Sequence, residues 1–173
     1  MPREIFAFHI WPELPEGVVG ARTGTMMASV AGLTFDVHGR EGRASGTAAD
    51  SGGVDAVSAA VELYARLKPD AGRQLHDDSP TALSIGVISG GDGPNRVATR
   101  CRLEGTLRAL SWADQDKAVA AIQAAAGAVA DEMGAKIEVT VTSGIRPPVR
   151  NSAESVARLQ AVCRRLAGVS WLF

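Results

Sequence analysis

Residues that bind transition metals are scarce in this sequence and lie far apart. It has only three histidines, His9, His38 and His76, and two cysteines, Cys101 and Cys163. A zinc site takes three or four ligands, and motifs for such sites place at least two of them at a fixed short spacing. The sequence contains no Cys-x-x-Cys, His-Glu-x-x-His or Cys-x-His motif. Taken alone, His9 is better explained as a packed or solvated side chain than as a ligand.

Signals for membranes, secretion and nucleic acid are also missing. No apolar run approaches the roughly twenty residues that span a bilayer, and the first residues lack the apolar stretch of a signal peptide. The net charge is -1, with basic residues scattered among acidic ones, so no surface for nucleic acid or an anionic membrane is expected. Two isolated cysteines fit a reducing compartment. We therefore expect a soluble, cytoplasmic protein with neither a nucleic-acid nor a membrane partner.

Alternating apolar and polar residues are present in four stretches, and each predicts a half-buried strand. The first stretch runs from Met26 to Val37, and a Gly-rich break separates the second from the third. The residues expected on the apolar faces are Leu33, Phe35 and Val37; Leu83, Ile85 and Val87; Cys101, Leu103 and Leu107; and Ile137, Val139 and Val141. The four faces together supply one side of a sheet that needs a covering layer.

Apolar residues at helical spacing predict three helices. The expected spans are Asp55 to Lys68, Ser111 to Gly134 and Asn151 to Gly168. Ser111 and Asp114 form a capping-box variant at the start of the second helix, which Gly134 should end. That helix is rich in alanine and can approach a sheet closely.

Residues 26–146 are therefore expected in the order strand, helix, strand, strand, helix, strand. This order favours a ferredoxin-like α+β sandwich, in which a four-stranded antiparallel sheet carries two helices on one face. The third helix follows as a C-terminal addition. We expect residues 26–146 to form one domain, with 1–25 and 147–173 as flanking segments. An edge strand of such a sheet offers a partner a place to pair.

Several segments occur in a fixed order along almost the whole chain: 9–17, 24–29 with 35–44, 90–95 with 103–108, and 146–151. Together they resemble the dinuclear zinc amidohydrolases and peptidases of the aminoacylase and carboxypeptidase family. The most similar branch cleaves N-acyl amino acids. By this resemblance 1–25 is a remnant of the catalytic domain, 26–146 is the lid or dimerisation domain, and 147–173 returns toward a missing catalytic domain.

The resemblance implies roles for four residues. His9 matches a metal-binding histidine of the family. Arg43 stands where the family has a lid histidine that helps to stabilise the tetrahedral intermediate, commonly in the partner subunit. Arginine would supply a permanent cation there without the titration of histidine. Asn95 matches a lid asparagine that approaches the substrate, and Arg108 matches the arginine after a Gly-Thr-Leu step.

Simpler explanations remain open for several residues. Asn95 follows Gly-Pro, where asparagine is common in turns for local backbone reasons. Arg108 is equally explained as an exposed strand arginine or an ion-pair partner. His38 is expected to be a solvated strand histidine, and Cys101 and Cys163 to be core residues and not nucleophiles.

The remaining catalytic segments of the family have no counterpart in this sequence: an earlier ligand-bearing segment, a Glu-Glu pair with the general base, and a last histidine. Hydrolysis at zinc needs both a metal that polarises the carbonyl group and a base that takes the proton. Complete members use zinc or another divalent metal, but we expect this chain to bind none.

Two functional hypotheses follow. In the first, the chain is the lid or dimerisation portion of a metal-dependent amidohydrolase and is not catalytically competent by itself. It would form a homodimer through the sheet edge or a helix, with a separate catalytic-domain chain as a possible further partner. In the second, it is a free-standing dimerisation or interaction module without enzymatic activity.

Overall fold

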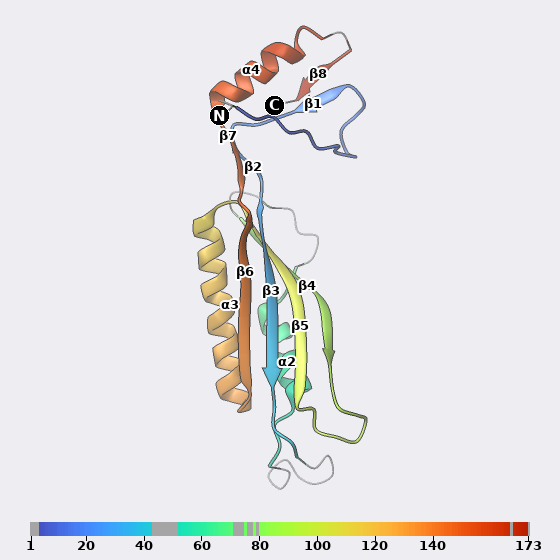
Figure 1. The fold of residues 1–173 in the computed structure, drawn as a ribbon, viewed down its shortest axis with the longest axis vertical. Coiled ribbons are helices and arrows are strands. Elements are labelled where there is room, and N and C mark those ends of the chain that lie inside the picture. The colour runs from blue at the N-terminus through green and yellow to red at the C-terminus, as the bar shows by residue number, and fades with distance from the viewer. Residues whose placement is uncertain are drawn as a thin grey trace. The chain divides into compact units, whose positions relative to one another are not determined.

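The computed structural model describes residues 4–42, 52–70, 75, 78, 80–166 and 168–172. The chain forms two compact units, unit 1 (Met1–Met27 and Val149–Phe173) and unit 2 (Ala28–Pro148). The elements of unit 2 are β3 (Ser29–His38), α2 (Ala56–Leu67), β4 (Thr81–Gly90), β5 (Arg100–Ala109), α3 (Trp112–Met133) and β6 (Lys136–Arg146). Figure 1 shows these four strands running side by side. The predicted order of elements is confirmed.

The sheet of unit 2 has the strand order β4-β5-β3-β6, and every neighbouring pair is antiparallel. Both α2 and α3 pack on the face that carries Leu33, Phe35 and Val37. This is the predicted ferredoxin-like α+β arrangement. We call the uncovered face of this sheet the open face. The proximal end of the sheet is where β3 begins, and the distal end is where β3 ends at His38.

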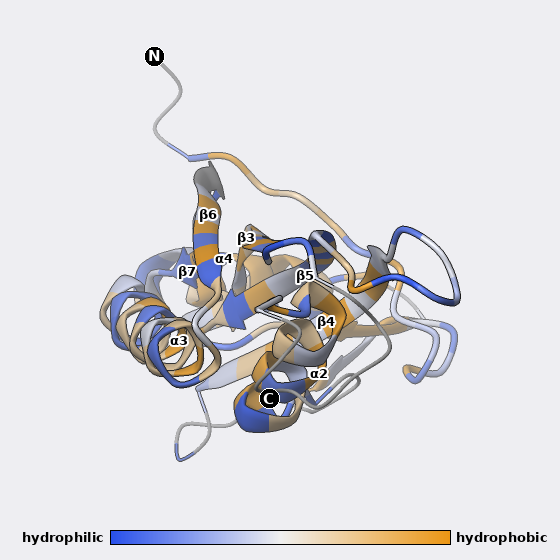
Figure 2. Cartoon of the chain, turned by 90° about the horizontal axis from the view of Figure 1, so that it is seen from below, coloured by the Kyte–Doolittle hydropathy of each residue, from blue (hydrophilic) through white to orange (hydrophobic). Residues whose placement is uncertain are grey.

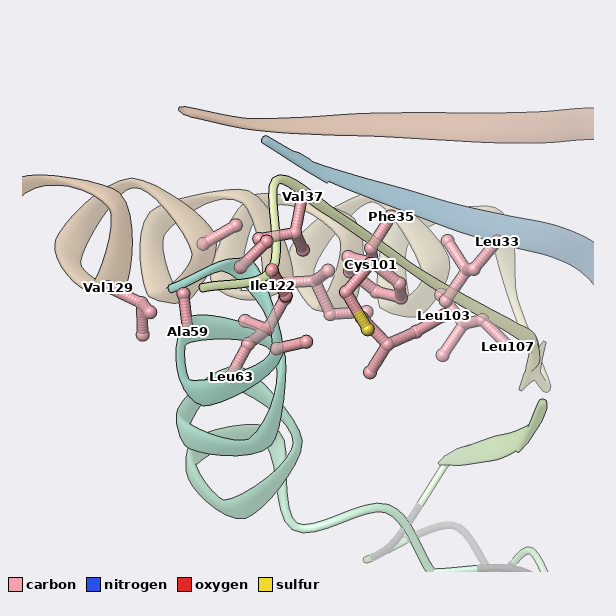
Figure 3. Close-up of a cluster of buried hydrophobic side chains, with 14 of the residues drawn as sticks. Leu33, Phe35, Val37, Ala59, Leu63, Cys101, Leu103, Leu107, Ile122 and Val129 are labelled. Carbon is pink, nitrogen blue, oxygen red and sulfur yellow. The ribbon is translucent and has the colours of Figure 1, made fainter. Parts of the chain in front are cut away.

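The core lies between the sheet and the two helices. Figure 3 shows Leu33, Phe35 and Val37 of β3 beside Leu103 of β5, with Leu63 of α2 in the same cluster. All five side chains are at most 2% exposed. Alternation along each strand separates them from the polar residues of the open face, and Figure 2 shows it as bands along β6.

Both helices of unit 2 begin and end for local reasons. Asp55 caps α2 by accepting a hydrogen bond from the Val57 amide at 3.0 Å. Ser111 caps α3 by accepting from the Asp114 amide at 3.1 Å, which confirms the predicted capping-box variant. Gly134 ends α3 with a left-handed φ of 64°, as predicted. Although α3 has 22 residues, no helix among the described residues is long and apolar enough to cross a bilayer.

Two strand predictions need correction. The expected strand from Met26 to Val37 is interrupted at Ala28, so its first residues belong to a separate strand in unit 1. In β4 a bulge at Gly86 shifts the register between Ile85 and Val87. Val87 therefore lies opposite Glu104 on the open face, and not on the apolar face as predicted.

Unit 1 is built from the two ends of the chain. Strand β1 (Val18–Gly20) pairs in parallel with β8 (Ser170–Leu172), and β2 (Gly24–Met27) pairs antiparallel with β7 (Val149–Asn151). The sequence patterns did not reveal these short strands except for the start of the first predicted strand. Helix α4 (Ala153–Cys163) has Ser152 as its N-cap, as the third predicted helix required, but it ends before Gly168.

Candidate functional site

Asn95 lies in the loop between β4 and β5, at the distal end of the sheet. The loop turns through Gly91 and Gly93, whose φ angles of 96° and 143° favour glycine. Asp92 Oδ2 closes it by accepting hydrogen bonds from the Thr99 amide at 2.7 Å and the Thr99 hydroxyl at 3.0 Å. These two bonds hold the pKa of the Asp92 carboxyl below its ordinary value. Asn95 itself is exposed within this closed loop.

The segment that leads toward Arg43 leaves β3 at the same distal end. The Gly39 amide donates to the Thr99 carbonyl at 2.9 Å, which joins this segment to the loop that carries Asn95. A Cβ atom on Gly39 would lie 2.1 Å from the Val54 carbonyl oxygen, so only glycine fits there. Arg43 lies outside the described residues, and so does His76.

Arg108 lies at the proximal end of β5, on the open face. It is exposed and stands opposite Val30 of β3 and Ala82 of β4. Arg100, where β5 begins, is eight residues away along the strand, a distance of about 27 Å at the usual rise per residue. The structure therefore places Asn95 and Arg108 at opposite ends of the sheet and does not bring them together (Figure 1).

A shallow depression of about 320 Å³ occurs on the distal part of the open face, and His38 and Asp36 line it. Arg102 spans its floor, with its guanidinium 3.2 Å from Asp36 Oδ1 and 2.8 Å from Glu104 Oε1. His38 is half-buried on the open face, which agrees with its predicted place on the strand. Because the charges here already neutralise each other, the depression offers no free charged group from Arg102 to a ligand.

His9 is exposed in unit 1. Among the described residues, no group of three or more His, Cys, Asp or Glu side chains gathers closely enough to hold a metal ion. The dinuclear metal centre that the resemblance implies therefore does not fit the described residues, since His9 supplies one ligand at most. Cys101 and Cys163 are free thiols, both buried, and burial raises the pKa of Cys101. A raised pKa disfavours the thiolate, so Cys101 is a core residue.

Sequence reasoning missed two polar contacts that shape unit 2. One is the closure of the Asn95 loop by Asp92, which the Gly-Gly-Asp-Gly sequence hints at without showing the partner. The other is a buried contact between Ser29, which is fully buried, and Gln115, which is 3% exposed. No sequence signal identifies this second pair, because 86 residues separate its members.

Comparison with known proteins supports the architecture and the resemblance together. The family model described as "Peptidase dimerisation domain", of the M20 peptidases, matches residues 27–134. The N-acetyldiaminopimelate deacetylase of Halalkalibacterium halodurans is 31% identical over 172 residues, which cover 99% of this chain and 45% of the relative. The corresponding deacetylase of Bacillus licheniformis is 34% identical over 123 residues, or 71% of this chain and 32% of the relative. The chain thus spans less than half the length of these relatives.

Solved structures show the same fold. The YXEP protein of Bacillus subtilis, a dinuclear metal-binding peptidase of the M20 family, superposes with a TM-score of 0.70 at 22% identity and covers 95% of this chain and 39% of its own. A tripeptidase of Staphylococcus aureus gives a TM-score of 0.70 at 25% identity, with 86% and 38% covered. Because the family model covers more than half of the chain and lies almost entirely on unit 2, this chain belongs to the M20 peptidase dimerisation domain family.

Proposed function

We propose that this chain is the lid and dimerisation portion of a metal-dependent amidohydrolase that hydrolyses N-acyl amino acids or related amides. The deacetylases that resemble it act, by their name, on an N-acetylated amino acid. Because the chain spans less than half of those proteins, hydrolysis is assigned to a complete protein and not to this chain. Zinc or another divalent metal would be bound there, with the position of His9 as one inherited ligand.

Unit 1 supports this proposal because it presents apolar surface to solvent. Five large apolar side chains of its N-terminal segment are between 47% and 94% exposed: Ile5, Phe6, Phe8, Ile10 and Trp11. Its β1 and β8 also form a parallel pair of only two strands. Parallel strands occur almost entirely inside sheets covered on both faces. We infer that unit 1 packs against a catalytic domain, in the same polypeptide or in a separate chain.

The observation that carries the dimerisation proposal is the edge strand β4. It is the outer strand of the sheet next to β5, and after the bulge at Gly86 its residues are exposed. Val87 and Ile88 are 47% and 48% exposed. An exposed apolar edge strand is a ready template for pairing with another strand. We infer that β4 of one copy pairs with β4 of a second copy.

Helix α2 adds apolar surface to the proposed interface. Val61 and Tyr64, one turn apart on α2, are 56% and 39% exposed. The start of α2 lies close to the end of β4, since a Cβ on Gly91 would be 3.9 Å from Val57 Cγ2. Complete burial of a large aliphatic side chain contributes about 1.5–3 kcal/mol, so covering these half-exposed residues in both copies would favour association.

Sedimentation at several concentrations tests the dimer. We expect a dimer for the native chain and a shift toward monomer for Ile88→Lys, because a charge at the pairing edge must be desolvated. Thr140→Lys is the matched control: Thr140 is an exposed residue of β6, which forms the opposite edge of the sheet. A native chain that stays monomeric at the highest concentration, or a control that dissociates as readily as Ile88→Lys, would refute the β4 interface.

A dimer would also explain the separation of Asn95 from Arg108. One small substrate cannot contact both residues of a single unit 2 across about 27 Å of strand. We propose that Asn95 serves the catalytic site of the partner copy, whereas Arg108 serves its own. The closure of the loop by Asp92 would then present Asn95 in one position to that partner site. The same role is proposed for Arg43, whose segment leaves β3 at the distal end.

A hydrolysis assay tests the division between chain and complete protein. Purified chain with added zinc, manganese or cobalt should give no turnover of N-acetyl amino acids, because a hydrolytic metal centre needs several ligands and a base. Metal-dependent turnover that follows the chain through purification would refute this assignment.

The second candidate function is a free-standing dimerisation module. It is favoured by the continuous core of unit 2, in which Phe35, Leu63 and Leu103 are fully buried without any contribution from unit 1. Sedimentation distinguishes it from the first function when a catalytic-domain chain is added: a module without that partner would remain a plain dimer. Both candidates place the protein in the cytoplasm, where buried free thiols such as Cys101 and Cys163 are usual.

A further inference from the structure

Charged side chains on the open face of unit 2 are paired at its distal end. Arg102 lies within 3.2 Å of Asp36 and 2.8 Å of Glu104, and Lys136 Nζ lies 2.5 Å from Glu138. The hydrogen bond from Lys136 also lowers the pKa of Glu138, which keeps that carboxylate ionised. The distal half of the open face therefore balances its own charge.

The proximal end of the same face is different. Val30 of β3 stands opposite Arg108 of β5 on one side and opposite Arg146 of β6 on the other. Residues opposite each other in an antiparallel pair share a face, so both arginines rise from the open face beside Val30. Two strand spacings separate their backbones, or about 10 Å. Both arginines are exposed.

No described side chain forms an ion pair with either of these arginines. The nearest acidic residue along β5 on this face is Glu104, and Arg102 already engages it. Like charges at neighbouring positions of a sheet are destabilising. Two guanidinium groups held side by side without an acid in the described part of the unit are therefore ready to take up negative charge from a ligand.

The surface beside the two arginines suits the rest of a small organic anion. In the next row, Gly32 lies between Thr106 and Thr142 and adds no side chain of its own. The Thr106 and Ser84 hydroxyls are 2.9 Å apart, which fixes their positions. Val30 and Gly32 thus give a low, partly apolar floor, and hydroxyl groups stand along its distal border.

We propose that Arg146, together with Arg108, forms a binding site for a dicarboxylate on the open face, with Arg146 as the residue that selects a second carboxylate. A guanidinium group binds a carboxylate through two parallel hydrogen bonds. One carboxylate leaves one of the two positive charges unbalanced, whereas two carboxylates balance both. A chain of about seven carbons spans the separation of the two strands and lies over Val30. The proposal deepens the substrate role proposed for Arg108 and rests on it.

A titration of the full chain with pimelate and with hexanoate, followed by amide and methyl NMR signals at constant ionic strength, tests the site. Pimelate is a seven-carbon dicarboxylate, and hexanoate is a monocarboxylate of similar length. Hydrogen bonds to charged groups are stronger than neutral ones, so pimelate should bind about tenfold more tightly than hexanoate. The shifts should concentrate at Val30, Gly32 and Thr106.

Variants assign the effect to named residues. Arg146→Gln and Arg108→Gln should each bring pimelate to the affinity of hexanoate. Arg100→Gln, on the same strand and face but at the distal end, should leave pimelate binding unchanged. Equal binding of pimelate and hexanoate, an unaffected Arg146→Gln variant, or inorganic phosphate that binds as tightly as pimelate would overturn the proposal. Sedimentation of the same samples reports the dimer separately, so failure of this site and failure of the proposed interface are distinguishable.

Discussion

Removal of the Ser29 hydroxyl should destabilise unit 2 more than its small size suggests. Ser29 Oγ lies 3.1 Å from the Ala109 carbonyl oxygen and 2.8 Å from Gln115 Oε1. A hydroxyl has one proton and can donate to only one of these oxygens. All groups are satisfied when the Gln115 amide is turned so that its nitrogen donates to Ser29, whose proton then goes to Ala109. The pair ties the start of β3 to the first turn of α3.

The magnitude follows from burial. Ser29 is fully buried and Gln115 is 3% exposed, so Ser29→Ala leaves a buried amide without its partner. Such a loss costs about 1–3 kcal/mol. Gln115→Leu should cost less, because Ser29 keeps its hydrogen bond to Ala109. The double variant Ser29→Ala with Gln115→Leu should cost clearly less than the sum of the two single variants, because removing both partners leaves no amide unpaired.

Guanidinium unfolding followed by far-ultraviolet circular dichroism measures these differences. At this chain length, 1 kcal/mol corresponds to a change in melting temperature of about 2–4 °C. Ser152→Ala is a control of the same chemical change at an exposed helix cap in unit 1, and it should leave the unfolding of unit 2 unchanged. A Ser29→Ala cost below about 0.5 kcal/mol, or strictly additive single and double variants, would refute the reasoning.

Further expected outcomes concern packing and pH. Gly105→Ala should cost about 1–3 kcal/mol because its Cβ would lie 2.1 Å from the Ser84 carbonyl oxygen, whereas Gly127→Ala should stabilise α3 by about 0.5–1 kcal/mol because its Cβ would meet nothing within 4 Å; chemical denaturation of both variants checks the opposite signs. Leu63→Ala should cost about 2–5 kcal/mol in the same assay, since Leu63 is fully buried between α2 and the sheet. A cost below that of an exposed substitution such as Val61→Ala would contradict this packing. The bond from Arg66 lowers the pKa of Glu132 below 4.5, so its contribution to stability should be present above pH 4.5 and be lost as the pH falls through the lowered value. Glu132→Gln should flatten the stability profile in that window, and an unchanged profile would contradict the role of the pair.

Much of unit 2 could be predicted because its signals are local. Leu33, Phe35 and Val37 alternate with polar neighbours whatever strand they pair with, and Ser111 with Asp114 marks the start of α3 within four residues. The prediction for Val87 was wrong because a bulge adds one residue and reverses the side on which the next residue lies. Nothing within the strand itself distinguishes a bulged glycine from an ordinary one.

The candidate site was less predictable than the fold. Residue types and the family resemblance singled out Asn95 and Arg108, but their spacing of thirteen residues gave no sign that a whole strand separates them. Arg146 was noted only as the end of the last strand. Its place beside Arg108 depends on the pairing of both β5 and β6 with β3, which joins residues far apart in the chain.

The sequence by itself determined which residues face the core, where the helices of unit 2 begin, and the order of strands and helices, because a period of two or 3.6 residues and a helix cap are properties of short segments. Only the tertiary structure decided that the two chain ends combine as β1 and β8, that Asn95 and Arg108 stand at opposite ends of one sheet, and that Arg146 flanks Val30. These facts depend on the register of hydrogen bonds between distant strands. A shift of one residue would leave each strand's alternation intact and change every neighbour across the sheet.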